Sequence, residues 1–226
     1  ATSFGHRYIF LYIGGFMLAI AIQKWNLHKR IAINIIYLIG SDLNRIILGF
    51  MIATAFLSMW VSNTATSVMM LPIALAIVQQ LSDNPATPKN EKTLFGKALM
   101  LAVAYSASIG GVATLIGSPV NLVLAGMVQE TYQMEITFIQ WLSFGLPFSI
   151  VLLFISWKYL TGYAFKLPIQ DFSRGKEEIL KQKNTLGPIS EEEKKVLLVF
   201  IITALAWISR SFLLNKFIPN LDDPII

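Results

Sequence analysis

Long runs without charge alternate with short polar segments along this chain. The first run, Tyr8 to Gln23, has 16 residues and would form a helix of about 24 Å, near the lower limit for crossing a bilayer. Basic residues and one Trp follow between Lys24 and Arg30, which is typical of a cytoplasmic membrane interface. The next stretch, Ile31 to Ile39, is too short to cross and predicts an interfacial helix.

The second run extends from Ile46 to Leu81 and is too long for one span. A single helix of this length would exceed 50 Å, whereas the hydrocarbon core is about 30 Å thick. Its most polar point, the stretch 61–64 with the letters VSNT, separates the limbs Ile46 to Trp60 and Ala65 to Leu81. Because the first limb reaches only about 22 Å, we predict a re-entrant hairpin with its tip at membrane depth.

The third run is interrupted by glycine. We expect Ser82 to Lys97 to form a polar loop. Two apolar pieces then flank the stretch 110–119, whose letters are GGVATLIGSP. The pieces 98–109 and 120–128 would measure about 18 and 14 Å, so neither crosses alone and together they predict one discontinuous helix. The rest is simpler: spans over 141–159 and 196–214, with a charged loop over 166–195 between them.

Composition agrees with a membrane solvent. Apolar residues make up 55% of the 226 residues, charged residues only 14%, and mean hydropathy is +0.62. With no cysteine and two histidines, the chain has no disulfide or thiolate framework and little to bind zinc. If the hairpin returns to its own side, 15 of the 18 Lys and Arg share one compartment. The net charge of +5 therefore indicates orientation, and we expect no nucleic-acid partner.

The two interruptions predict ion chemistry. A helix beginning near Ala65 presents free N–H groups, with Ser62 and Thr64 as candidate caps, and Ser118-Pro119 fits an N-cap followed by proline at the first helical position. Paired positive helix ends favour an anion. Carbonyls at the ends of the preceding limbs, together with the Ser62 and Asn63 oxygens, would suit a sodium ion.

Each feature also has a simpler interpretation. Ser-Asn-Thr taken alone is as easily a loop, and Gly110-Gly111 taken alone is more often a helix-packing contact. We expect Arg210 to snorkel to the interface and Asp222-Asp223 to form a solvated loop. An intramembrane enzyme would need ionisable residues inside the apolar runs, where only Arg210 occurs; a structural membrane subunit would leave both interruptions unexplained.

Three stretches resemble the divalent anion:sodium symporter family, the bacterial relatives of mammalian sodium-coupled dicarboxylate, citrate and sulfate carriers. They are FLSMWVSNTAT at 56–66, followed by MLP at 70–72; YSASIGGVATLIGSPVN at 105–121; and GGF at 14–16, leading to KWNLHKR at 24–30. Val120 departs from the family pattern, in which a second proline often follows.

The resemblance implies a homodimeric, elevator-type transporter in the inner (plasma) membrane, built from two inverted repeats. It implies substrate contacts at Ser62, Asn63 and Thr64, to which the helix-end argument adds Ser118 and Pro119. It implies a sodium site at Ser58, Ser62 and Asn63 with backbone near Gly110 and Gly111. No second Ser-Asn-Thr occurs, so we expect this chain to be the N-terminal portion of a longer transporter, with one half of the site. The resemblance also implies a C4-dicarboxylate such as succinate over sulfate, because family members with Thr at the position of Thr64 lean towards carboxylates; sulfate stays the alternative.

We therefore predict an all-α polytopic membrane protein forming one inverted repeat, with a re-entrant hairpin and a discontinuous transmembrane helix. The predicted division is a scaffold part with a transmembrane and an interfacial helix (1–44), the hairpin (45–81), a cytoplasmic loop with the broken helix as transport part (82–130), a transmembrane helix (131–160), a charged cytoplasmic loop (161–195), and a last helix with the start of a second repeat (196–226).

Overall fold

The chain folds into helices joined by short connections. The computed structural model describes residues 7–39, 42–82, 89–166, 173–218 and 221–226, and within these ranges no strand occurs. The helices are α1 (Arg7–Lys24), α2 (Leu27–Ile39), α3 (Leu43–Ser58), α4 (Asn63–Ser82), α5 (Lys89–Val112), α6 (Pro119–Tyr132), α7 (Phe138–Lys158), α8 (Ser173–Thr185), α9 (Glu191–Ser209) and α10 (Asn215–Phe217). Two π-helical turns, η2 (Tyr159–Ala164) and η3 (Arg210–Leu214), and a 3-10 turn, η4 (Asp223–Ile225), complete them.

The all-α polytopic membrane fold is confirmed. Four helical segments are long and apolar enough to cross a membrane, and they cover 63–81, 92–112, 138–164 and 191–217. The pair formed by α1 and α2, bent by 74° between them, raises this to five if it counts as one span. The α3 helix is apolar but shorter. Whether the α3–α4 hairpin is re-entrant stays a prediction.

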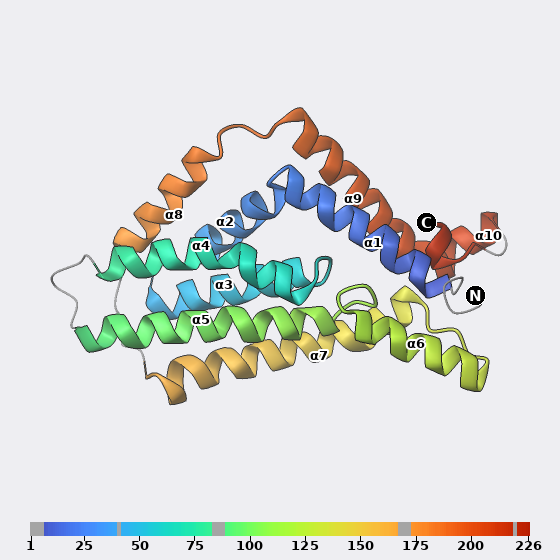
Figure 1. Ribbon diagram of the computed structural model, residues 1–226, viewed down its shortest axis with the longest axis horizontal. Helices are drawn as coiled ribbons and strands as arrows, with labels where there is room; N and C mark the ends of the chain where they lie inside the picture. The colour runs from blue at the N-terminus through green and yellow to red at the C-terminus, as the bar shows by residue number, and fades with distance from the viewer. Residues whose placement is uncertain (1–6, 40–41, 83–88, 167–172, 219–220) are drawn as a thin grey trace.

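Helices α3, α4, α5 and α7 run side by side, and α1 and α9 cross them obliquely as a second pair (Figure 1). The core lies along α3, where Ile46, Ile47, Phe50 and Met51 are fully buried against α2, α4 and α5. Figure 1 also places the α3–α4 tip midway along the molecule, beside the break between α5 and α6.

Two predicted loops contain helix instead. The α5 helix begins at Lys89, within the loop expected over 82–97, and its 24 residues make about 36 Å, so the expectation that this piece cannot cross alone is wrong. Similarly, α8 occupies part of the charged loop. Glu, Lys, Gln and Leu are good helix formers, so these segments are polar without being irregular. Residues 83–88 and 167–172 of the two loops lie outside the described residues.

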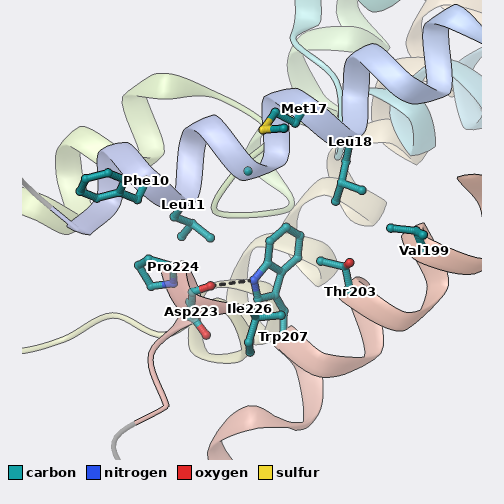
Figure 2. A pocket seen from close by; sticks show the side chains of 11 residues that line it. Phe10, Leu11, Met17, Leu18, Val199, Thr203, Trp207, Asp223, Pro224 and Ile226 are labelled. Carbon is teal, nitrogen blue, oxygen red and sulfur yellow. Dashed lines mark hydrogen bonds between the residues drawn. The ribbon is translucent and has the colours of Figure 1, made fainter.

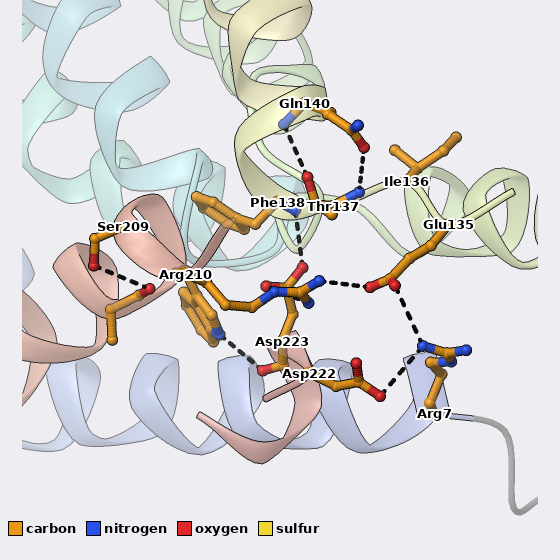
Figure 3. A network of polar contacts seen from close by, with 12 residues as sticks. Arg7, Glu135, Ile136, Thr137, Phe138, Gln140, Ser209, Arg210, Asp222 and Asp223 are labelled. Atoms are coloured by element: carbon orange, nitrogen blue, oxygen red, sulfur yellow. Dashed lines mark hydrogen bonds and ion pairs between the residues drawn. The ribbon is translucent and has the colours of Figure 1, made fainter. Parts of the chain in front are cut away.

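The far end of α9 is tied down by ion pairs (Figure 3). The Arg210 guanidinium lies 2.9 Å from both Glu135 and Asp223, and Arg210 and Asp223 are each 3% exposed. Asp223 also accepts a hydrogen bond from the Phe138 N–H at the start of α7. The expectations of a snorkelling Arg210 and a solvated Asp223 are therefore wrong, because the two groups neutralise each other in the interior. Asp222 remains partly exposed and pairs with Arg7.

Helices α3 and α5 make the closest approach in the core. A Cβ added at Gly110 would stand 2.5 Å from the Cα of Ala55, whereas one added at Gly14 would meet nothing within 4 Å. Only the absence of a side chain at Gly110 permits this contact.

We predict that Gly110→Ala destabilises the fold by about 1–3 kcal/mol, because two backbones must separate to admit the methyl group. Thermal unfolding of the purified protein in detergent measures this as a lower Tm. Gly14→Ala is the matched control and should leave Tm unchanged or raise it slightly, because alanine favours a helix over glycine where space is free. Equal melting of the two variants would contradict the close approach of α3 and α5.

Candidate functional site

The first interruption is the hairpin tip between α3 and α4. The α4 helix begins at Asn63, two residues earlier than expected, and Ser62 occupies the cap position. The Ser62 hydroxyl accepts the Ala65 N–H at 3.4 Å, and its carbonyl accepts the Thr66 N–H at 2.9 Å. Ser62 is thus a cap as predicted. Thr64 is not a cap, because it lies inside the first helical turn with its side chain exposed.

The second interruption covers residues 113–118. The α5 helix continues through Gly110 and Gly111 to Val112, so the break begins three residues later than predicted. Ser118 is the N-cap of α6 in extended conformation and Pro119 is the first helical residue, as predicted. The Ser118 side chain makes no capping hydrogen bond, so its hydroxyl does not satisfy an N–H group of α6.

The two interruptions interlock. The Thr114 hydroxyl in the second break donates to the Met59 carbonyl at the hairpin tip. The Asn63 side chain lies over Gly111, where an added Cβ would stand 2.8 Å from the Asn63 amide carbon. A glycine at position 111 is therefore required for Asn63 to take this position.

Side chains satisfy the carbonyls that the end of α5 leaves open. Each accepts a hydrogen bond from a neighbouring helix: Ile109 from the Ser149 hydroxyl at 2.8 Å, Gly111 from the Asn121 amide at 2.8 Å, and Val112 from the Trp141 indole at 2.9 Å. Asn121 also donates to the Thr114 carbonyl at 2.8 Å and is only 7% exposed. Such partners are required where no water competes.

Three oxygens converge beside Ser58, which is fully buried. The Ser58 Oγ lies 2.8 Å from the Asn63 Oδ1 and 2.6 Å from the Ala107 carbonyl oxygen. One hydroxyl hydrogen faces two acceptors, so the cluster has an excess of lone pairs. A small cation with oxygen ligands would complete such a group.

The structure places the predicted residues in three different surroundings. Ser58, Asn63 and Gly111 gather at the oxygen cluster, whereas Gly110 faces Ala55 and acts in helix packing. Ser62 and Pro119 line a small cavity of about 10 Å³ beside α1, which has room for about one water molecule. Sequence reasoning missed Ala107, which acts through its backbone, and gave no role to Thr114 and Asn121, which lie in the same motif.

A larger pocket lies elsewhere, between α1 and α9 (Figure 2). Its volume is about 310 Å³, and apolar side chains such as Phe10, Leu11 and Val199 line most of it. None of the predicted site residues lines this pocket.

Comparisons with known proteins find similar sequences along nearly the whole chain. Residues 1–222 match the family described as the sodium:sulfate symporter transmembrane region. The chain is 44% identical over 217 residues to the sodium-dependent dicarboxylate transporter SdcS of Staphylococcus saprophyticus, and 44% identical over 219 residues to SdcS of Staphylococcus aureus strain USA300. These matches cover 95% and 96% of this chain but 42% of each relative, so the chain spans less than half the length of these relatives.

Asn121 provides the test of how the break is held. We predict that Asn121→Ala destabilises the protein by about 1–3 kcal/mol, because the buried Gly111 and Thr114 carbonyls lose their amide donor. A lower Tm in detergent measures the loss. Asn34→Ala is the control, because the Asn34 amide donates only to Arg30 within its own helix. A Tm change no larger than in the control would contradict the role of Asn121.

Proposed function

The chain belongs to the sodium:sulfate symporter family, and from this premise we propose that it supplies one half of the binding site of a sodium-coupled transporter for small divalent anions. The family and these relatives are named as transporters and not as enzymes. The observation that carries the proposal is the oxygen cluster at Ser58 beside two helix N-termini, at interlocked breaks in apolar helices.

The anion half-site uses the N-termini of α4 and α6. Each directs a positive dipole end away from its first turn. Ser62, Asn63 and Thr64 stand at the first end, and Ser118 and Pro119 stand at the second. Because the cavity shared by Ser62 and Pro119 is too small for a dicarboxylate, a second half of the protein would supply the rest of the site.

The sodium half-site uses the oxygens beside Ser58. The Asn63 amide oxygen and the Ala107 carbonyl oxygen both lie within hydrogen-bond distance of the Ser58 hydroxyl, and uncharged oxygens are ligands for a hard cation. Gly111 contributes by leaving space for Asn63. Asn63 belongs to both half-sites, so sodium bound there would fix the residue that meets the anion. This shared residue is the physical basis of coupling.

We propose a C4-dicarboxylate such as succinate as the substrate. The SdcS relatives are named as dicarboxylate transporters, which supports a dicarboxylate. Sulfate is the second candidate, because the family description names it. Both are compact divalent anions suited to paired helix ends.

We assign the chain to a bacterial plasma membrane, with the helix ends that adjoin its basic segments in the cytoplasm. The ends of α3, α4, α5 and α7 that adjoin basic segments lie at one side of the molecule (Figure 1). We further propose that the hairpin and the broken helix, within residues 45–130, move as an elevator against a scaffold containing residues 1–44, in a homodimer.

Transport tests the proposal directly. We predict that proteoliposomes containing the full-length transporter show counterflow of labelled succinate with sodium but not with potassium. We expect excess unlabelled succinate to compete better than excess sulfate. Sodium-independent counterflow would contradict the coupling, and stronger competition by sulfate would assign the site to the inorganic anion.

In the same assay, Asn63→Ala should reduce the initial rate about tenfold or more, because the sodium half-site loses an oxygen ligand and the anion half-site loses a hydrogen bond to a charged group. The control is Asn34→Ala, which lies in α2 outside the hairpin and should transport normally. An active Asn63→Ala protein would refute the shared role.

Ser58 separates sodium binding from anion binding. We predict that Ser58→Ala raises the sodium concentration for half-maximal transport about fivefold, because one oxygen ligand is lost. The half-saturating succinate concentration at saturating sodium should change less. Ser106→Ala is the matched control, since Ser106 is equally buried but donates within its own helix. An unchanged sodium dependence in Ser58→Ala would remove Ser58 from the cation site.

A further inference from the structure

A basic groove lies where the N-terminus of α3 meets the end of α7. Its volume is about 660 Å³, and its lining includes Arg45, Lys158 and Lys166 together with Asp42, Asn44 and Gly162. None of these residues belongs to the interruptions, and the transport chemistry makes no use of them. The groove is therefore a separate feature of the molecule.

The charges of the groove do not balance. Its carboxylate, Asp42, pairs with Arg45 at 3.0 Å and also caps α3 by accepting the Arg45 N–H. Among the described residues, Lys158 and Lys166 form no ion pair with a carboxylate. Three cations against one engaged carboxylate leave the lining two charges positive, which favours an anion.

The groove also contains an unsatisfied polar atom. The Asn44 backbone carbonyl accepts the Trp157 indole N–H at 3.0 Å, but the Asn44 side-chain oxygen is buried with no hydrogen-bond partner in the described part of the chain. Such an atom is costly unless a partner reaches it. A ligand with an anionic group would neutralise the free cations, and a hydroxyl beside that group would reach the Asn44 oxygen once this side chain turns towards the groove.

The position along α7 indicates where that ligand comes from. The groove lies at the end of the segment 138–164, which is apolar enough to cross a membrane and mostly unburied. Tyr159 and Tyr163, exposed by 54% and 72%, stack on each other beside it, and the Lys158 ammonium lies 4.6 Å above the Trp157 ring. Aromatic rings and lysines in this arrangement mark the level of the lipid headgroups.

We propose that this groove binds the headgroup of an anionic phospholipid of the phosphatidylglycerol type. The phosphate pairs with the cations of Arg45, Lys158 and Lys166, and a glycerol hydroxyl donates to Asn44. Basic pockets between helices at the cytoplasmic face suit such headgroups. The π-helical turn η2, which carries Thr161 and Gly162, forms part of the wall.

Gly162 allows a test that changes charge alone. A Cβ at this position would meet nothing within 4 Å, so a side chain can enter the groove without collision. We predict that Gly162→Asp lowers the ratio of bound phosphatidylglycerol to bound phosphatidylcholine about fivefold relative to the isosteric Gly162→Asn. The ratio is measured by native mass spectrometry of the protein released from bilayer nanodiscs of the two lipids in equimolar mixture.

Lysine variants provide an independent arm if substitution in the π-helical turn disturbs folding. Lys158→Gln should lower the same ratio about fivefold, whereas Lys195→Gln, an exposed lysine outside the groove, should not. Equal retention of the two lipids by the unmodified protein would overturn the proposal, as would equal ratios in Gly162→Asp and Gly162→Asn. Millimolar glycerol phosphate should leave the lipid bound, and displacement by it would assign the groove to a soluble phosphate instead.

Discussion

Backbone N–H and C=O groups inside a bilayer must find their partners within the protein, and this constraint determines how the two interruptions are arranged. The break after α5 is held by side chains from α6 and α7, and the hairpin tip is held by Thr114 of that same break. Neither interruption satisfies its backbone alone. The polar atoms that remain, around Ser58 and at the starts of α4 and α6, are available for ions.

The same logic extends to charge at the ends of α9. At one end Arg30 of α2 pairs with Glu193 through two contacts of 3.0 and 3.1 Å and also donates to three carbonyls between Leu186 and Pro188. At the other end Arg210 pairs with Glu135 and Asp223. Buried ion pairs contribute little net stability but are strongly destabilising when one partner is lost. They therefore fix α9 against α2 at one end and against the start of α7 at the other. The interruptions themselves contain no charged side chain.

Residue types carried most of the information that the sequence contained. The polar triplet at 62–64 and the glycine-rich stretch at 110–119 located both interruptions, because such residues are costly in apolar helices unless used. The sequence did not predict that α5 begins at Lys89 or that α8 begins at Ser173. Both helices begin in polar segments, and hydropathy indicates which solvent a segment faces, not whether its backbone is helical. The burial of Arg210 was also missed, because its partner Glu135 is 75 residues away. The Ala107 carbonyl has no signature in the sequence at all.

A double-mutant cycle between Asn63 and Gly111 tests the central claim that the interruptions form one interlocked site. When Asn63 is present, Gly111→Ala displaces the Asn63 side chain from its place beside Ser58. Once Asn63 is replaced by alanine, the three atoms nearest to the added methyl group are gone. We therefore predict that the two substitutions are non-additive by about 1 kcal/mol or more in unfolding free energy, with the double variant more stable than the sum of the two single effects requires. Additivity within about 0.5 kcal/mol would contradict it.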